Sequence, residues 1–379
     1  MTGNHFDVIV LGGGTMGTAA AWALAKRGVS TLVLEQFSHV HAMGSHGGHT
    51  RIFRHAYSEG ANYVPLMHRA DQLWCELGES LGLDIVHRAG ILEMDSLGTH
   101  HSHNALTAAQ QHGIPYEWLR ADEIRRRWPA FNPPDDWEGG YSDRAGFLEV
   151  EPALKGMAAL ARRGGVQISE HTPVTKWRVD TAGCTVETAK GTFSADRLIV
   201  TGGSWSSQLL KSLGLPLTVV RKVVFWLDVE DPALFHPDKF PVFAADTGVS
   251  EIYGFPIYGL PGMKVANHLG GQPAAPDSVD RSVDASEARE ILNCTSFLLP
   301  AVSDRIVASM VCLYTRTPDE HFIIDRHPEH SRVTIAAGFS GHGFKFATVV
   351  GEHLADLALN ANVQPYDLFR IDRFGGVTS

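Results

Sequence analysis

The chain has 379 residues, of which 44% are hydrophobic and 20% charged, and its formal net charge is -10. This length is sufficient for two domains with substantial cores. The acidic balance argues against a nucleic-acid partner, because phosphates require a basic surface. No apolar run reaches the roughly 18 residues of a membrane span. The first apolar stretch is too short for a signal peptide, so we expect a cytoplasmic protein with no membrane partner.

The chain begins with a pattern typical of a nucleotide-binding βαβ unit. Residues 7–11 and 31–34 are short β-branched runs that predict buried strands, and residues 18–26 form an alanine-rich helix pattern. Between the first strand and the helix lies a G-x-G-x-x-G fingerprint at residues 12–17. A complete unit of this kind is much more specific than the glycine motif alone.

The fingerprint residues have distinct expected roles. Gly12 permits the tight turn, Gly14 lets the backbone approach a pyrophosphate, and Gly17 permits close packing of helix on strand. The helix N-terminus offers free N–H groups to the phosphates. Glu35, at the end of the second strand, is placed to hold the ribose hydroxyls. Its carboxylate would repel a 2′-phosphate, which disfavours NADP.

Further elements follow along the chain. Residues 55–83 and 286–299 have helical periodicity, and residues 116–128 predict a helix whose three consecutive arginines form a solvated face. Alternation over residues 174–200 predicts a β-hairpin, and residues 219–228 and 265–272 predict strands of a second sheet.

Two late strands favour FAD over NAD as the dinucleotide. Residues 196–200 and 332–338 both read as strands that end in glycines, far from the first unit. A nucleotide domain assembled from distant segments is typical of two-domain flavin oxidoreductases. We therefore expect an α/β fold in which a Rossmann-like FAD-binding domain and a mixed-sheet substrate domain interleave along the sequence.

Cysteine and histidine give no metal pattern. The four cysteines, at positions 75, 184, 294 and 312, form no C-x-x-C pair, which predicts a reducing compartment and no disulfides. His327 and His330 flank a proline, with no evident third ligand on a rigid element, so we predict no metal site. Three histidines at positions 100, 101 and 103 are predicted to lie in a polar loop.

Three segments together carry a family resemblance. They are the fingerprint at residues 12–17, the segment 310–319 around Cys312, and the glycine-rich segment 338–345. With residues 44–60, 253–256 and 321–325 they resemble the monomeric sarcosine oxidase and N-methyltryptophan oxidase family, in the same order over nearly the whole chain. The resemblance implies an FAD-binding domain from residues 1–86, 147–217 and 319–379, and a substrate domain from residues 87–146 and 218–318.

The resemblance also implies how the cofactor is held. In the family, the cysteine that matches Cys312 is bonded through sulfur to the 8α carbon of FAD, and Arg51 would favour the thiolate that forms this bond. The other residues with an implied cofactor role, besides the fingerprint glycines and Glu35, are Ser45, His46, Thr50 and Gly343.

The implied substrate is a secondary amine that carries a carboxylate. Arg54 and Lys345 match the family's carboxylate clamp, in which an arginine fork and a lysine charge bind one anion. Lys264 matches the oxygen-activating lysine, whose charge would stabilise superoxide. The remaining implied residues on the substrate side are Arg51, Tyr253, His268, Tyr314 and Gly341. His268 either takes the proton of the amine or only shapes the pocket.

One loop departs from the family pattern. The family has histidine, glycine and aspartate before the Thr-Arg pair, whereas this chain has Gly47, Gly48 and His49. Loss of the carboxylate could change how this loop packs on the flavin, but both arginines are retained.

The expected activity is oxidation of sarcosine by O2 to glycine, formaldehyde and hydrogen peroxide, by a monomer. The segment 311–317 is closer to the sarcosine oxidases, and a bulkier substrate such as N-methyltryptophan is the alternative. A dehydrogenase that passes electrons to another acceptor is disfavoured by Lys264. A flavin-binding subunit without turnover is disfavoured by the clamp residues.

Overall fold

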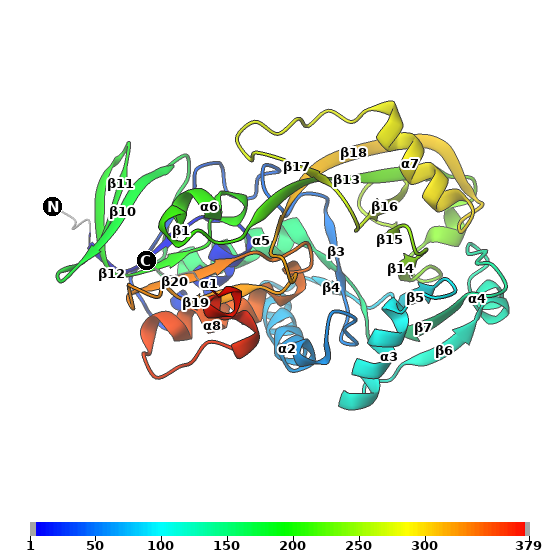
Figure 1. Cartoon of the computed structure of the whole chain (residues 1–379), viewed down its shortest axis with the longest axis horizontal. Helices are drawn as coiled ribbons and strands as arrows, with labels where there is room; N and C mark the ends of the chain where they lie inside the picture. The colour runs from blue at the N-terminus through cyan, green and yellow to red at the C-terminus, as the bar shows by residue number, and fades with distance from the viewer. Residues whose placement is uncertain (1–4, 376–379) are drawn as a thin grey trace.

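The computed structural model describes residues 5–375. The molecule is elongated, with one large sheet at each end of its long axis (Figure 1). The sheets contain eight and nine strands, and a third sheet of three strands is also present in the described part of the chain. Within these residues, no helix combines the length and the apolar character that crossing a membrane requires.

The first large sheet is built around parallel strands from three distant parts of the sequence. β1 pairs in parallel with β2 and β12, and β12 pairs in parallel with β20. The strands of this sheet are β1 (His5–Leu11), β2 (Thr31–Leu34), β9 (Gln167–Ser169), β10 (Val174–Asp180), β11 (Gly183–Thr188), β12 (Gly191–Val200), β19 (Ile323–Arg326) and β20 (Val333–Ala337). β2, the second half of β1 (residues 8–11) and the end of β12 (residues 198–200) are largely apolar and are buried, as expected of strands covered on both faces.

Four helices pack together beside this sheet and form its largest core. They are α1 (Thr15–Ala25), α2 (Val64–Leu81), α5 (Val150–Arg163) and α8 (Ala347–Leu359). α1 consists largely of alanine and is buried along most of its length, which lets α5 and α8 approach it closely. Gly351 of α8 lies against α1, where an added Cβ would come within 2.4 Å of the Ala19 carbonyl carbon.

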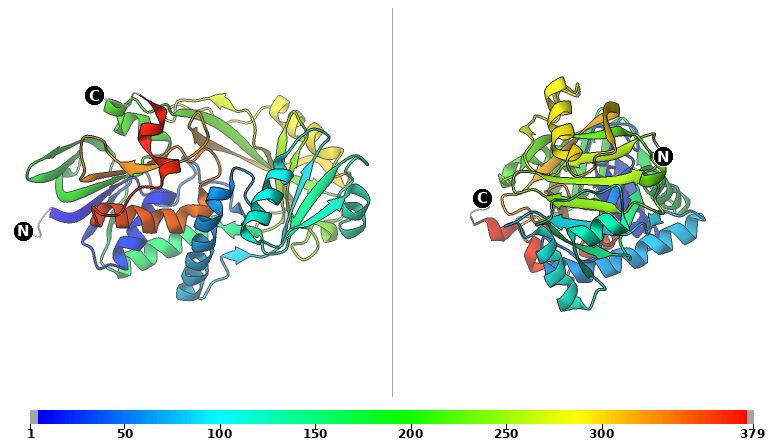
Figure 2. Two further views of the ribbon diagram at one scale, coloured as in Figure 1. Left: turned by 60° about the horizontal axis from the view of Figure 1, so that its bottom comes forward. Right: turned by 90° about the vertical axis from the view of Figure 1, so that its right-hand side faces the viewer.

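The second large sheet is mixed and mostly antiparallel. Its strands are β5 (Ile91–Asp95), β6 (Glu117–Arg120), β7 (Glu138–Ser142), β13 (Thr218–Val229), β14 (Val242–Asp246), β15 (Glu251–Ile257), β16 (Met263–Asn267), β17 (Gln272–Pro273) and β18 (Val302–Arg316). The long strands β13 and β18 pair antiparallel and place Lys222 opposite Cys312. Helices α3 (His101–His112), α4 (Ala121–Arg127) and α7 (Ala285–Ser296) accompany this sheet (Figure 2).

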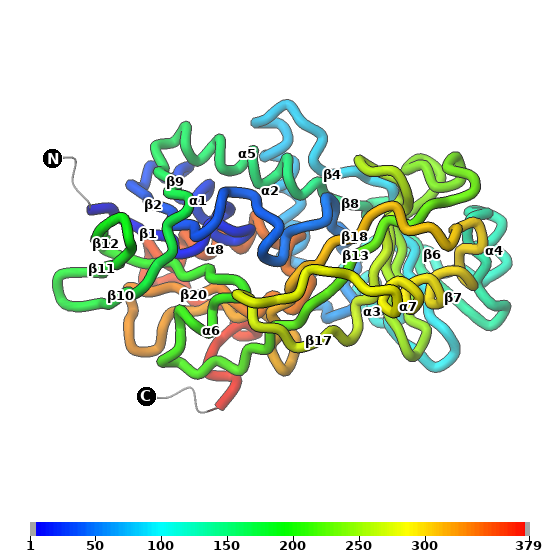
Figure 3. Tube along the Cα trace, turned by 90° about the horizontal axis from the view of Figure 1, so that it is seen from above, coloured from blue at the N-terminus to red at the C-terminus, as the bar shows by residue number. Residues whose placement is uncertain are grey.

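The chain moves between the two large sheets near the small sheet, which consists of β3 (Thr50–Phe53), β4 (Val86–His87) and β8 (Gly146–Glu149). It passes from β4 to β5, returns from β7 to β8, and crosses again between β12 and β13 and between β18 and β19. In Figure 3, β4, β8, β13 and β18 lie between the two ends of the molecule. The division into two domains with the stated boundaries stays a prediction, and its residues 1–4 and 376–379 lie outside the described residues.

Most predicted elements are confirmed, with four corrections. The first strand, first helix and second strand are confirmed, and the 55–83 pattern contains α2. The helix expected over 116–128 is wrong in its first half, because 117–120 form strand β6 and only 121–127 are helical. Residues 174–200 form three strands because a second turn occurs at 181–182. The strand expected over 265–272 ends at Asn267.

The fourth correction concerns the histidines expected in a polar loop. His101 begins helix α3, and its side chain is only 10% exposed because it lies among carboxylates of the second sheet. The arginines at 125–127 are surface residues, as predicted. They form ion pairs with nearby carboxylates, which are Glu117, Glu123 and Asp135.

Candidate active site

An extended cavity begins at the turn between β1 and α1, where the three fingerprint glycines have different surroundings. A Cβ on Gly12 would lie 2.5 Å from the Thr201 carbonyl oxygen, and its φ of +101° favours glycine. A Cβ on Gly17 would lie 1.8 Å from the Gly12 carbonyl oxygen. Gly14 lines the cavity and has no atom within 4 Å of an added Cβ. Gly12 and Gly17 therefore serve packing, while Gly14 leaves backbone open to a ligand.

Glu35 lies at the end of β2 and also lines this cavity. Its carboxylate accepts hydrogen bonds from the backbone N–H of Gly13 at 2.7 Å and of Phe37 at 2.9 Å. These bonds fix the carboxylate beside the glycine turn, where a ribose would follow a pyrophosphate bound at the α1 N-terminus.

The far end of the cavity approaches the second sheet. It is lined there by Ser45, His46, Arg51, Tyr314, Gly341 and Gly343. The His46 ring is buried, and its Nε2 atom has no hydrogen-bond partner within residues 5–375. Burial and the neighbouring His41 lower the pKa of His46 to about 3, so the ring is neutral. An unpartnered ring nitrogen and a long cavity that starts at a dinucleotide fingerprint fit FAD, which would span from the glycine turn to the second sheet.

The loop before β3 lies against Cys312. Arg51 donates to the carbonyl oxygens of Ser45 at 2.7 Å and Gly47 at 2.6 Å, and Cys312 Sγ lies 3.6 Å from the Gly47 oxygen. A Cβ on Gly47 would lie 2.7 Å from Met310 Sδ and 3.4 Å from Cys312 Sγ. Met310 therefore occupies the space that a side chain at position 47 would need, which explains why glycine fits here in place of the family's histidine.

Lys264 is buried beneath the same loop. It lines neither this cavity nor a second cavity that adjoins it. Its ammonium donates to the carbonyl oxygens of Gly48 at 2.6 Å and Thr50 at 2.8 Å, and to the Thr50 hydroxyl at 3.2 Å. The Phe255 ring lies 4.4 Å from Nζ. Burial and the nearby Arg51 hold the pKa of Lys264 well below its usual value. Lys264 therefore lies behind the loop, with its Nζ hydrogen-bonded to the loop backbone rather than exposed on a cavity wall.

A second cavity adjoins the first and shares Arg51, Tyr314 and Gly341 with it. Gly341 has a φ of +86°, and a Cβ there would overlap the Tyr314 ring at 2.3 Å. Tyr314 also contacts Tyr253 through their hydroxyl groups, which are 3.3 Å apart. The other lining residues relevant to the site are Arg54, Glu59, Lys222, Ala244, Glu251, His268, Cys312, His342 and Lys345. Of the expected substrate-side residues, only Lys264 is outside this cavity.

Arg54 and Lys345 both line the second cavity, but Arg54 already has partners. Its guanidinium pairs with the buried Glu93 and with Glu59, the latter at 2.6 Å. Burial opposes the charged form of Arg54, yet Glu59 and Glu93 raise its pKa above the usual value. Lys345 donates to the Tyr57 hydroxyl at 3.3 Å and the His342 carbonyl oxygen at 3.2 Å. Burial and the nearby Arg54 lower the pKa of Lys345 to about 7.

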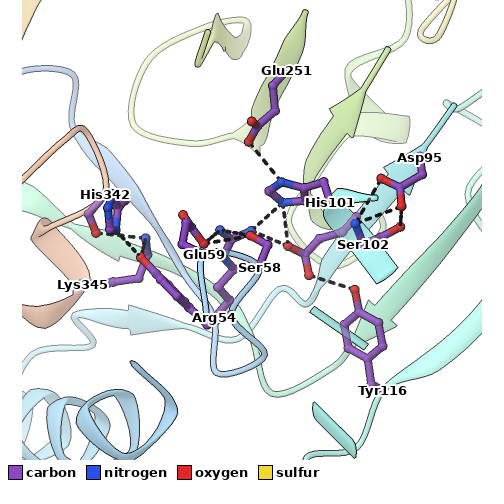
Figure 4. A network of polar contacts seen from close by, with 12 residues as sticks. Arg54, Ser58, Glu59, Asp95, His101, Ser102, Tyr116, Glu251, His342 and Lys345 are labelled. Atoms are coloured by element: carbon purple, nitrogen blue, oxygen red, sulfur yellow. Dashed lines mark hydrogen bonds and ion pairs between the residues drawn. The ribbon is translucent and has the colours of Figure 1, made fainter. Parts of the chain in front are cut away.

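A chain of ionic contacts extends from Arg54, and its members beyond Arg54 were not identified from the sequence (Figure 4). His101 Nε2 lies 3.0 Å from Arg54 Nη1 and 3.2 Å from the Glu93 carboxylate. His101 Nδ1 lies 3.4 Å from the carboxylate of Glu251, which faces the cavity. Burial opposes the charged form of His101, but Glu93 and Glu251 raise its pKa. These residues lie far apart in the sequence and carry no motif that could have indicated them.

Lys222 is a further cavity residue that the sequence did not indicate. It donates to the carbonyl oxygens of residues 268, 269 and 270, at 3.1, 2.6 and 3.4 Å. Burial lowers its pKa to about 8, and Arg316 contributes in the same direction. Lys222 therefore fixes the loop that follows His268. Burial lowers the pKa of His268 itself to about 3, which makes it a neutral hydrogen-bonding group.

The histidine pair at 327 and 330 has a third potential ligand, Glu329, which lies in the same turn and not on a helix or strand. Ligand atoms of His327, Glu329 and His330 lie within 4.8 Å of one another. However, His327 Nδ1 accepts a hydrogen bond from the Glu329 backbone N–H, so the proton of the neutral ring is on Nε2.

Comparison with known proteins places the chain in a class. Residues 7–357 match the family described as FAD dependent oxidoreductase. The structure resembles NikD, an unusual amino acid oxidase essential for nikkomycin biosynthesis, with a TM-score of 0.85, 25% identity and coverage of 97% of both chains. Glycine oxidase from Geobacillus kaustophilus has the same fold, with a TM-score of 0.79 at 23% identity over 97% of this chain and 99% of that chain. The chain therefore belongs to the FAD-dependent oxidoreductases, with the predicted two-domain α/β flavoprotein fold.

Closer relatives specify the branch. The chain is 40% identical to monomeric sarcosine oxidase of Bacillus sp. (strain B-0618), over 97% of this chain and 96% of that protein. It is 35% identical to N-methyl-L-tryptophan oxidase of Yersinia pestis (strain Pestoides F), over 97% and 99%. The chain is thus a flavin-dependent amine oxidase of the sarcosine oxidase and N-methyltryptophan oxidase family, which confirms the predicted resemblance.

Proposed function

We propose that this protein oxidises N-methyl amino acids, uses O2 as electron acceptor, and carries FAD bonded covalently to Cys312. The observation that carries this proposal is the joint placement of two cations, Arg54 and Lys345, with Cys312 on the wall of one cavity. A carboxylate held by the two cations would orient its amine within the same cavity. We further propose that it acts as a monomer, as its relatives named monomeric sarcosine oxidase do, and in the cytoplasm, which its four free cysteines support.

Binding of a substrate carboxylate involves an exchange of partners. The Arg54 fork is shared between Glu93 and Glu59, and the Glu59 side chain lies at the cavity wall. A substrate carboxylate would take the Glu59 position on Arg54 and add a contact to Lys345. Glu93 is fully buried and would remain in place, which keeps Arg54 oriented. The cost of moving Glu59 is offset by the new charge-assisted hydrogen bonds.

The amine must lose its ammonium proton before oxidation, because a cationic nitrogen cannot release electrons. The cations Arg51 and Lys222 disfavour an ammonium in their own part of the cavity. With its pKa of about 3, His268 is a weak proton acceptor near neutral pH. Of the two roles considered for His268, we therefore favour hydrogen bonding and pocket shape. Bound FAD would supply the redox chemistry, by accepting two electrons from the methyl carbon and passing them to oxygen.

Cys312 is positioned for attachment by its strand and by the loop above it. It lies in β18, is 2% exposed, and lines the cavity through which a flavin ring would reach it. A Cys312→Ser variant should release its flavin on denaturation, whereas the wild-type protein should stay yellow after denaturant and gel filtration. Complete release of flavin from the wild-type protein would contradict the covalent link without affecting the proposed oxidation.

Anaerobic titration with sarcosine, followed at the flavin absorbance near 450 nm, tests the oxidation. Prompt bleaching is the expected result, and hydrogen peroxide should form when air is admitted. Bleaching without peroxide would instead indicate a dehydrogenase.

N-Methyltryptophan is the second candidate substrate. It is favoured by Ala244 on the cavity wall, because the small alanine side chain leaves room for a bulky substrate side chain. Bleaching by N-methyltryptophan but not by sarcosine would move the assignment to bulky substrates.

A further inference from the structure

We propose that Glu251 determines substrate specificity, by binding a cationic group at the end of the substrate's side chain. This inference rests on the proposed function and names a substrate class within it: N-methyl amino acids with basic side chains. Sarcosine shares their amine and carboxylate but would leave the Glu251 end of the cavity empty.

The first argument is the accessible, under-partnered state of the carboxylate. The Glu251 side chain lines the second cavity and is 20% exposed. Among residues 5–375 its carboxylate has a single ion-pair partner, His101, at 3.4 Å. His101 is also in contact with Glu93 through its other nitrogen, so its charge is shared between two carboxylates. A carboxylate that faces a cavity with one shared, distant donor can accept further hydrogen bonds.

The second argument is that the other cations of the cavity are committed elsewhere. Lys222 directs its ammonium to three backbone carbonyl oxygens. Arg54 is bonded to Glu59 and Glu93, and Lys345 to Tyr57 and a backbone carbonyl oxygen. No lysine or arginine in the described chain forms an ion pair with Glu251. A cation that pairs with this carboxylate in addition to His101 would therefore come from a ligand.

The third argument is that one face of β15 forms a cavity wall that leads from Tyr253 to Glu251. Tyr253 and Glu251 lie two residues apart on β15, which places their side chains on the same face about 6–7 Å apart. The backbone N–H of His268 donates to the Glu251 carbonyl oxygen at 2.7 Å, so Glu251 directly follows the His268 and Tyr253 wall. On the neighbouring strand, Ala244 pairs with Tyr253 and adds little bulk. A side chain that leaves the amine along this wall would end at Glu251.

The fourth argument is the separation between the two charged ends. One imidazole ring, that of His101, lies between Arg54 and Glu251, with contacts of 3.0 and 3.4 Å (Figure 4). A substrate carboxylate at Arg54 and a substrate cation at Glu251 would therefore be separated by one ring and its contacts. This separation is comparable to that between the carboxylate and the ammonium of a lysine.

The test compares two substrates of nearly equal shape. Nα-methyl-L-lysine and N-methyl-L-norleucine differ mainly in the terminal ammonium group. In the wild-type enzyme we expect kcat/KM for the lysine derivative to exceed that for the norleucine derivative by about tenfold to a hundredfold, as a charge-assisted hydrogen bond would provide. In Glu251→Gln this ratio should fall to about one, and in Glu251→Lys it should invert, with N-methyl-L-glutamate becoming the better substrate.

Glu230→Gln is the matched control. Glu230 is exposed, lies immediately after β13 and does not line the cavity, so its substitution should leave the ratio unchanged. Equal or lower kcat/KM for the lysine derivative in the wild type, or an unchanged ratio in Glu251→Gln, would overturn the inference. The wild-type comparison is decisive even if a variant does not fold. If sarcosine bleaches the flavin while this preference is absent, only the inference fails, whereas no bleaching by any of these amines overturns the proposed function as well.

Discussion

The two cavities are built in different ways, and the difference explains why local sequence motifs indicate the first one more completely than the second. The first cavity, which begins at the glycine turn, is formed mainly by backbone and small residues at the ends of parallel strands, so its requirements are local. The second cavity carries charged side chains from β3 and the segment after it, from β13 and β15, and from the C-terminal glycine-rich segment, and their effect depends on their partners. Arg54 illustrates this: its charge is shared with two carboxylates before any substrate binds.

The largest expected effect concerns the charge behind the substrate cavity. Lys264→Met should leave anaerobic bleaching of the flavin largely intact but slow reoxidation by air about a hundredfold to a thousandfold, because a fixed cation near the developing anion is lost. Stopped-flow absorbance measures both steps separately. Lys239→Met, at an exposed position, is the control. Reoxidation of Lys264→Met at the wild-type rate would remove Lys264 from the oxygen reaction.

The next prediction separates packing from ligand binding within the nucleotide cavity. Gly17→Ala should destabilise the fold by about 3 kcal/mol or more, because its Cβ would overlap the Gly12 oxygen. Gly14→Ala should keep the melting temperature of the flavin-free protein but incorporate much less flavin, since its Cβ meets only the cavity. Thermal melts and the absorbance ratio at 450 and 280 nm check both. Equal melting temperatures for the two variants would contradict the assigned roles.

The third prediction uses the titration of Lys345. Burial and Arg54 lower its pKa to about 7, so the ammonium is present below this pH and is lost as the pH rises through it. The KM for a carboxylate substrate should therefore rise above pH 7, by up to about tenfold per pH unit. The rise should disappear in Lys345→Met, whose KM should be high at all pH values. A wild-type KM that falls with pH would show that proton loss from the substrate amine dominates instead.

The smallest effect concerns the loop that departs from the family. Gly47→Ala should destabilise the protein by about 1 kcal/mol, because the new methyl group would press on the flexible end of Met310. Met310→Ala should relieve this cost in the double variant, which a double-mutant cycle of melting temperatures would measure. Additive effects of the two substitutions would mean that Met310 does not fill the space at position 47.

Much of the fold was predictable because its signals are periodic and local. The short apolar strands, the alanine-rich helix and the late glycine-ended strands identified the first sheet correctly. The prediction of one helix over residues 116–128 is wrong because a four-residue edge strand directly precedes a seven-residue helix, and neither is long enough to establish a period. The prediction that His101 lies in a polar loop is wrong, because His101 begins α3 and is buried against Glu93 of β5 and Glu251 of β15.

The amino-acid sequence alone was sufficient to identify the dinucleotide fingerprint, the flavin-oxidase family and the set of residues that match the family's motifs. These follow from glycine spacing and local patterns, which are properties of contiguous segments. The folded structure was needed to show which charges are already paired and that Lys264 lies behind a loop. It was also needed to show that Met310 fills the space next to position 47 and that Glu251 faces the second cavity with one ion-pair partner among the described residues. Electrostatic state depends on burial and on neighbours brought together by folding, and neither is encoded at any single position of the chain.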